Sequence, residues 1–284
     1  RHTRFKCDWS SDVCSSDLQS GIVTHEGGMG AATGDFDNDG CVDLYVTSRG
    51  RNQLFKNNCN GTFADVSAKS RTDDPSWSVS AAFVDYDRDG WLDLFVGNYL
   101  DWSAEKSRPC FGPSGRPDYC SPNVFDPQPS KLFHNNRDGT FTDVTAKAGM
   151  AREFGPALGV TTADFNGDGW IDLYVANDGQ PNQLWLNQHD GTFKNAGLLS
   201  GTALSMHGKA KAGMGVDAGD VDNDGDEDLF VTNLTGEGND LYINNGTALF
   251  EEQSARSGFG VLSRAYTGFG AAWLDRKSTR LNSS

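Results

Sequence analysis

Carboxylate side chains recur through this chain in a nine-residue pattern that appears four times. Aspartate or asparagine occupies positions 1, 3, 5 and 9 of each copy, and glycine occupies position 6. Oxygen ligands at this spacing, with a glycine that permits a sharp turn, suit a hard cation such as Ca²⁺. Without a cation, these carboxylates would repel one another strongly. The pattern therefore predicts one calcium ion per loop, which gives four ions for the four copies.

Within each copy, positions 1, 3, 5 and 9 are expected to contribute side-chain oxygens, and position 7 is expected to contribute only its backbone carbonyl. The predicted metal ligands are Asp35, Asp37, Asp39, Cys41 and Asp43 in loop 1; Asp85, Asp87, Asp89, Trp91 and Asp93 in loop 2; Asp164, Asn166, Asp168, Trp170 and Asp172 in loop 3; and Asp220, Asp222, Asp224, Asp226 and Asp228 in loop 4.

The loops differ from EF-hands, which open with the same spacing but close with a glutamate at position 12 between two helices. Position 12 here is valine in every copy, and each valine lies in a short apolar run: Val46, Val96, Val175 and Val231. The loops are therefore expected to join β-strands. Mg²⁺ fits less well than Ca²⁺, because it prefers to keep several of its waters.

The elements that must position the loops also repeat. Position 1 falls at 35, 85, 164 and 220, and a fifth copy begins at Asp275. A strand of small residues precedes each loop, an apolar strand follows it, and a hairpin with an Asn-rich turn completes the unit. Four antiparallel strands per unit predict an all-β fold, a β-propeller of four blades plus a partial one, with the small-residue strand innermost. An extended β-solenoid is the alternative.

The repeat pattern also sets the expected boundaries. Residues 19–275 form the predicted propeller fragment, with an insertion at about 99–130. Residues 1–18 and 276–284 share none of the pattern and resemble translated adapter sequence, so they are interpreted as non-native flanks. Because the fifth copy is cut after Asp275, the native protein is expected to continue.

Charge and hydropathy exclude several function classes. The net charge is −15 at pH 7. Such acidity disfavours binding to nucleic acid and to anionic lipid, both of which need a basic surface. The chain has no apolar run long enough for a transmembrane helix.

Four cysteines lie between the flanks: Cys41, Cys59, Cys110 and Cys120. An even number in an acidic, glycine-rich chain suggests disulfides and an extracytoplasmic location, that is, secreted, periplasmic or cell-surface. Three pairings are possible, and we favour Cys41–Cys59 with Cys110–Cys120. Free thiols are the alternative.

The loops and the Asn-rich hairpins resemble FG-GAP/VCBS repeats, whose calcium-loop blades also form integrin α-chain propellers. The Cys110–Cys120 insertion makes the closer resemblance one to bacterial FG-GAP proteins related to cartilage acidic protein, which often carry an ASPIC/UnbV domain. The resemblance covers essentially all of 19–275. It implies a secreted or cell-surface, calcium-dependent propeller used for binding or adhesion.

No catalytic pattern was found among the histidines, and His134 and His189 are expected in solvated hairpin turns. The chain contains neither a phosphate loop nor a nucleophile elbow. We therefore predict a non-enzymatic module that binds a protein or glycan ligand, possibly through the Cys110–Cys120 insertion, which Trp102 opens. A propeller-based polysaccharide lyase or hydrolase, and a structural support for a missing C-terminal domain, are the alternatives.

Overall fold

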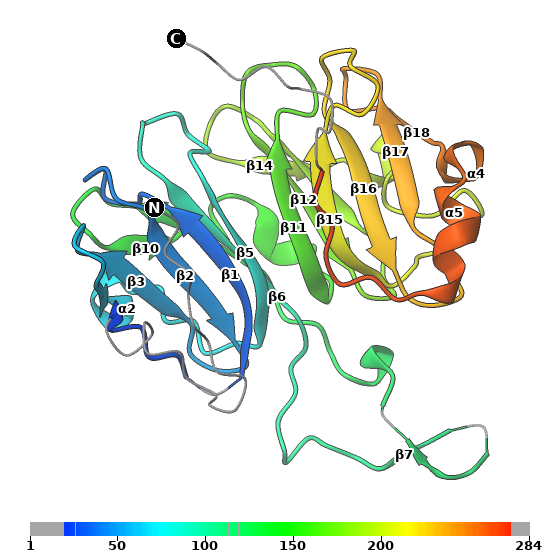
Figure 1. The fold of residues 1–284 in the computed structure, drawn as a ribbon, viewed down its shortest axis with the longest axis horizontal. Helices are drawn as coiled ribbons and strands as arrows, with labels where there is room; N and C mark the ends of the chain where they lie inside the picture. The colour runs from blue at the N-terminus through cyan, green and yellow to red at the C-terminus, as the bar shows by residue number, and fades with distance from the viewer. Residues whose placement is uncertain (1–19, 26, 113, 119, 274–284) are drawn as a thin grey trace, which may run out of the picture.

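The computed structural model describes residues 20–25, 27–112, 114–118 and 120–273. The predicted flanks at 1–18 and 276–284 and the fifth-copy Asp275 lie outside these residues. Four four-stranded antiparallel sheets make up most of the described chain (Figure 1). Within each sheet the strands lie side by side in the order in which they occur along the chain. The predicted all-β class and the four-stranded units are thus confirmed.

Each sheet corresponds to one sequence repeat. Sheet 1 contains β1 (Gly28–Gly34), β2 (Asp43–Ser48), β3 (Gln53–Asn57) and β4 (Phe63–Asp65); sheet 2 contains β5 (Ser78–Val84), β6 (Asp93–Asn98), β9 (Lys131–Asn135) and β10 (Phe141–Asp143). Sheet 3 contains β11 (Ala157–Ala163), β12 (Asp172–Asn177), β13 (Gln183–Asn187) and β14 (Phe193–Asn195); sheet 4 contains β15 (Gly213–Gly219), β16 (Asp228–Asn233), β17 (Asp240–Asn244) and β18 (Phe250–Glu252).

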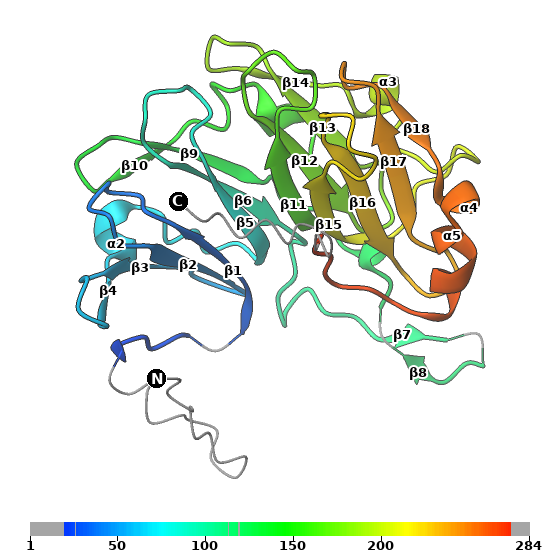
Figure 2. The same ribbon diagram turned by 45° about the horizontal axis from the view of Figure 1, so that its top comes forward.

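The sheets are arranged as an open fan in which the first strand of each lies toward the centre (Figure 2). Successive first strands β1, β5, β11 and β15 contact one another. Small residues make this close approach possible: a side chain on Gly30 would lie 2.3 Å from the Val79 carbonyl oxygen, and one on Gly159 would lie 2.8 Å from that of Met214. Sheets 1 and 4 stand at the two ends of the fan, which does not close into a ring within the described residues.

The hydrophobic core consists of three clusters, one in each space between neighbouring sheets. Between sheets 3 and 4, for example, the fully buried Tyr174 and Leu184 pack against Leu229 and Tyr242. Second and third strands supply most of these side chains, as their apolar runs predict. Burial of this kind is the main favourable contribution to folding, and here it fixes the angle between neighbouring sheets.

A further segment occupies the position of a fifth first strand. Residues 267–273 run alongside β15 (Figure 1, red). The Thr232 hydroxyl donates to the Gly268 carbonyl oxygen at 2.8 Å, and the Trp273 amide donates to Asp217 at 2.8 Å. A side chain on Gly215 would lie 2.7 Å from the Gly270 Cα. The run-up to the fifth copy therefore packs on sheet 4 as β15 packs on β11.

Short helices lie between successive sheets: α2 (Ser67–Ser70), η2 (Met150–Arg152) and α3 (Gly197–Ser200). The helix η1 (Pro122–Val124) lies in the insertion, and α4 (Ser254–Ser257), α5 (Phe259–Leu262) and η3 (Ser263–Ala265) follow sheet 4. Residues 99–130 leave sheet 2 after β6 and return at β9. They project away from the fan and include the small hairpin β7 (Cys110–Phe111) and β8 (Pro117–Asp118) (Figure 1). Among the described residues, no helix has the length and apolarity needed to cross a membrane.

Candidate functional site

Every acidic loop joins the first strand of a sheet to the second, and its backbone is held by its own aspartates. In loop 1, the Asp35 carboxylate accepts from the Asp39 amide at 3.1 Å and the Gly40 amide at 2.8 Å. Asp39 in turn accepts from the Cys41 amide at 2.9 Å. The same three bonds recur in the other loops. The loops are thus ordered by hydrogen bonds to positions 1 and 5.

Two positions of each loop adopt left-handed backbone conformations. Gly40, at position 6 of loop 1, has φ of 88°, in the region that favours glycine. Position 4 is also left-handed, with φ of 54° at Asn38 and 59° at Arg88. Position 4 is asparagine in two loops and glycine in a third, and these residues tolerate such a conformation.

The aspartate at position 9 is the buried carboxylate of each loop and bridges the loop to its hairpin. Asp172 is fully buried, with an exposed fraction of 0%. Its two oxygens accept from the Phe165 amide at 3.1 Å and the Asn187 amide at 2.8 Å. Asp43 and Asp228 make the equivalent pair of bonds in their sheets. Position 9 therefore has a structural role that sequence reasoning missed.

Burial changes the acidity of these bridging carboxyls. Removal from water disfavours the charged form, and this raises the pKa of Asp43 to about 6, that of Asp172 to about 7 and that of Asp93 to about 8. It raises the pKa of Asp228 as well. Neighbouring loop carboxylates act in the same direction. A bound cation would favour the charged form instead.

The side chains present fit a hard cation. In loop 2, one oxygen each of Asp85, Asp87 and Asp93, at positions 1, 3 and 9, lie within 4.8 Å of one another. Loop 4 contains the equivalent cluster, and in loop 1 the cluster is formed by positions 1, 3 and 5. The Oδ1 atoms of Asp37 and Asp87 and the Oδ2 atom of Asp93 are buried and have no hydrogen-bond partner among the described residues. Buried oxygens without a donor are costly, and a divalent cation would supply the missing interaction.

Basic side chains of the hairpins face three of the loops. Lys56 forms ion pairs with Asp37 and with Asp39, the latter at 2.6 Å, and its ammonium lowers the pKa of Asp39. The Arg137 guanidinium contacts Asp89 at 2.6 Å. In loop 3, His189 lies 2.8 Å from the carboxylate of Asp168. Around loop 4, the described residues place no such ion pair.

Of the two hairpin histidines, His189 is exposed in its turn as predicted, whereas His134 is half-buried in a strand. His134 lies in β9, and its Nδ1 atom is 3.1 Å from Asp93 and 3.4 Å from Asp87. His189 stacks on Trp170, with ring centroids 4.9 Å apart. His134 directly precedes the hairpin asparagine Asn135, and His189 follows Asn187 by two residues. These positions relative to the hairpin asparagine are the sequence feature that brings both rings to the loops.

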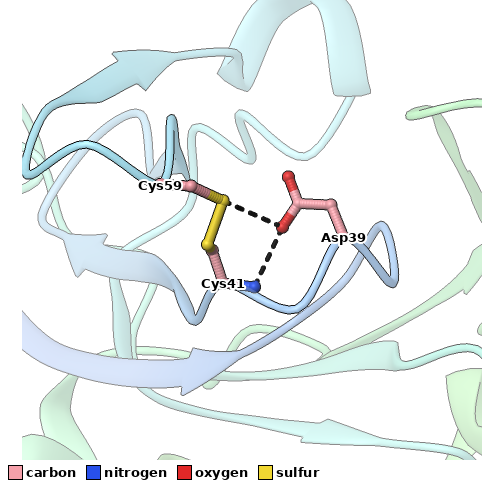
Figure 3. A group of neighbouring side chains, drawn as sticks. All are labelled: Asp39, Cys41 and Cys59. Carbon is pink, nitrogen blue, oxygen red and sulfur yellow. Dashed lines mark hydrogen bonds between the residues drawn. A yellow bond between two sulfur atoms is a disulfide. The ribbon is translucent and has the colours of Figure 1, made fainter.

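Loop 1 is also linked covalently to its hairpin. Cys41, at position 7, is disulfide-bonded to Cys59, as predicted, with Cα atoms 5.6 Å apart (Figure 3). The Asp39 carboxylate lies against this bond: one oxygen is 3.7 Å from the Cys59 sulfur. The sulfurs are oxidised, so they are not thiolate ligands. Cys41 can offer only its carbonyl to an ion.

In sheets 2, 3 and 4, an asparagine at the start of the hairpin turn links the sheet to the loop of the preceding sheet. The Asn187 side-chain amide donates to the Tyr86 carbonyl oxygen of loop 2 at 2.8 Å and to the Ile171 carbonyl of its own loop at 3.2 Å. Asn135 and Asn244 make the equivalent bonds to Phe36 and Phe165. The loops therefore hold successive sheets together.

The insertion lies at the other end of sheet 2 from loop 2, because β6 begins at position 9 of that loop and ends where the insertion starts. A cavity of about 490 Å³ lies between the insertion and the edge of the sheet. The second predicted disulfide, Cys110–Cys120, closes the β7–β8 hairpin that forms its outer wall. Aromatic side chains provide much of the remaining wall: Trp77, Tyr99, Trp102, Phe111 and Phe125.

The chain is similar in sequence to known proteins. The model of the FG-GAP-like repeat matches it at residues 24–96, 114–175 and 164–231, more than half of its length. The chain belongs to the FG-GAP-like repeat family. The resemblance read from the loops and hairpins is thereby confirmed.

Cartilage acidic protein 1 is a relative of this chain among curated proteins. The human protein is 33% identical over 106 residues, which is 37% of this chain and 16% of the relative. The mouse protein is 26% identical over 234 residues, 81% of this chain and 33% of the relative. This chain thus spans a third or less of the length of these relatives.

One solved structure is described by its recognition of non-reducing terminal N-acetylglucosamine by an Agrocybe aegerita lectin. It is 16% identical, covering 85% of this chain and 69% of the lectin chain, with a TM-score of 0.36. That similarity is too low to bear on fold or ligand.

Proposed function

We propose that this FG-GAP-like chain is a calcium-binding, extracytoplasmic β-propeller module that binds protein or glycan ligands and has no catalytic role. The observation that carries the calcium part is the set of buried carboxylate oxygens without partners at Asp37, Asp87 and Asp93. The predicted ligands at positions 1, 3, 5 and 9, with the carbonyl of position 7, would hold one ion in each loop.

Calcium would act structurally. Loops 1, 2 and 3 each accept a bond from the asparagine of the following sheet, as Tyr86 accepts from Asn187. An ion there would neutralise mutually repelling carboxylates and rigidify the junction between sheets. The insertion cavity lies at the opposite end of sheet 2, so the ion in loop 2 would support the binding surface without touching the ligand. Two disulfides support an oxidising, extracytoplasmic location.

Thermal unfolding tests the proposal. The purified chain is unfolded in excess EDTA, then in millimolar Ca²⁺, with Mg²⁺ as the matched control. We expect the melting temperature to rise markedly in Ca²⁺ and to change less in Mg²⁺, which keeps its waters. A melting temperature that is the same with EDTA and with Ca²⁺ would refute a structural calcium role.

A further inference from the structure

We infer that the insertion cavity is a binding site for a neutral pyranose ring of a glycan. This inference rests on the proposed binding function and narrows it to one class of ligand. The cavity of about 490 Å³ lies within the range of roughly 300–1,000 Å³ that small-ligand sites occupy. It is large enough for one or two sugar rings.

The inner wall of the cavity is a rigid aromatic cluster. Trp77 packs edge-on against Tyr99, with centroids 5.2 Å apart, and against Trp102 at 6.2 Å. The Tyr99 hydroxyl is anchored by Asp178 of the neighbouring sheet at 2.5 Å. The Arg49 guanidinium covers the Trp102 ring at 4.9 Å. These contacts hold the rings in place before any ligand arrives, which limits the entropy lost on binding.

The outer wall supplies an exposed ring and polar groups. Phe111, in the disulfide-closed hairpin, is 63% exposed. Arg108 and Asp118 line the same cavity. The Arg108 guanidinium carries five N–H donors, and one Nη2 donor is used on the Val124 carbonyl at 2.5 Å. The Trp77 indole nitrogen is buried and lacks an acceptor among the described residues.

This mixture selects a sugar ring over other ligands. The C–H faces of a pyranose pack against aromatic rings, and its rim hydroxyls can accept hydrogen bonds from the remaining Arg108 donors and from the Trp77 indole N–H. A purely apolar side chain would leave the buried Trp77 indole N–H without an acceptor. The cavity lining carries one charged residue of each sign, Arg108 and Asp118, so it has no net charge that would favour an acidic or a basic glycan. A neutral glycan therefore fits best.

Saturation-transfer NMR and calorimetry with cellobiose, lactose and chitobiose test the inference on the calcium-loaded chain. We expect at least one sugar to bind, and Phe111→Ala and Trp102→Ala to weaken that binding about tenfold or more. Tyr266→Ala is the matched control, since Tyr266 is 72% exposed and lies outside the cavity lining. It should bind like the parent chain.

The calcium-dependent melting temperature is measured on the same samples. If calcium stabilises the chain and none of the sugars binds, the glycan inference fails while the calcium proposal stands. Sugar binding that is unchanged in both Phe111→Ala and Trp102→Ala would also overturn the assignment. So would binding of a proline-rich peptide at this cavity with no response to sugar. Phe111→Ala should not disturb folding, because this exposed ring lies outside the core, so a loss of sugar binding in this variant reports on the cavity.

Discussion

At the scale of single residues, the loop carboxylates perform two distinct tasks. Position 1 and position 5 fix the loop backbone, while position 9 is buried beneath the loop and holds the hairpin. Asp93 shows the cost of the second task, because burial raises the pKa of its carboxyl to about 8. The unpartnered oxygens of Asp37 and Asp87 mark where a cation would offset that cost.

The buried carboxyls predict an unusual pH dependence of stability. The folded pKa values of Asp43, Asp172 and Asp93, about 6, 7 and 8, exceed the ordinary value of 3.8. The folded chain therefore binds more protons than the unfolded chain between about pH 4 and 8, and its stability falls as pH rises through this window. In EDTA, the melting temperature should be higher at pH 5.5 than at pH 8.5.

Calcium should reverse this dependence, because the ion binds ionised carboxylates and competes with protons. With millimolar Ca²⁺, the difference between pH 5.5 and pH 8.5 should vanish or change sign. A melting temperature in EDTA that rises between these two pH values would contradict the buried, protonated state of the three carboxyls.

Lys56 gives a second residue-scale prediction. Its ammonium pairs with Asp37 and Asp39, two of the predicted calcium ligands. Lys56→Met removes an ammonium group that competes with calcium for these carboxylates. The partly exposed ion pair is worth roughly 1 kcal/mol, so its loss should make loop 1 bind calcium about fivefold more tightly. The midpoint of the calcium-induced thermal shift measures this. Lys209→Met is the control, because Lys209 is exposed and precedes β15, at the opposite end of that strand from loop 4. Equal midpoints for the two variants would argue against loop 1 as a metal site.

At the scale of elements, the sheet and its loop form one unit, and the asparagine of the next hairpin attaches it to its neighbour. The repeat spacing and strand patterns predicted these four-stranded units from sequence, since alternation and turn residues act locally. The inter-sheet bonds of Asn135, Asn187 and Asn244 were not predicted. An asparagine in a hairpin turn is already explained by its tolerance of left-handed conformations, so nothing in the sequence distinguishes its second, long-range role.

The inter-sheet bond can be isolated with a matched pair of variants. Asn187→Ala leaves the Tyr86 carbonyl of the preceding sheet without its donor. Asn57 occupies the same place in sheet 1, which stands at the end of the fan, and its amide donates only within its own sheet, to Val42 at 2.9 Å. Urea unfolding should show that Asn187→Ala costs about 1–3 kcal/mol more than Asn57→Ala. Equal losses would mean that the inter-sheet bond contributes nothing measurable.

At the scale of the whole molecule, the candidate metal sites and the candidate ligand cavity lie at opposite ends of the strands. The acidic loops gather at the end where second strands begin, and in sheet 2 the insertion and its cavity lie where the second strand finishes. The position of the insertion could be read from the long spacing between loops 2 and 3. Its cavity could not, because Trp77, Tyr99 and Phe111 come together only through the fold. The family match covers residues on both sides of the insertion, so it identifies the repeat scaffold and does not identify a ligand.

Calorimetric titration of the chelator-treated chain with Ca²⁺ tests the central claim most directly. We predict saturable binding of one ion per loop, four in the parent chain, with the loop containing Asn166 the weakest because it has one carboxylate fewer. Asp222→Ala should remove one ion from the stoichiometry, and Glu251→Gln, at an exposed hairpin position, should leave it unchanged. No binding at millimolar Ca²⁺, or an unaltered stoichiometry in Asp222→Ala, would contradict the account.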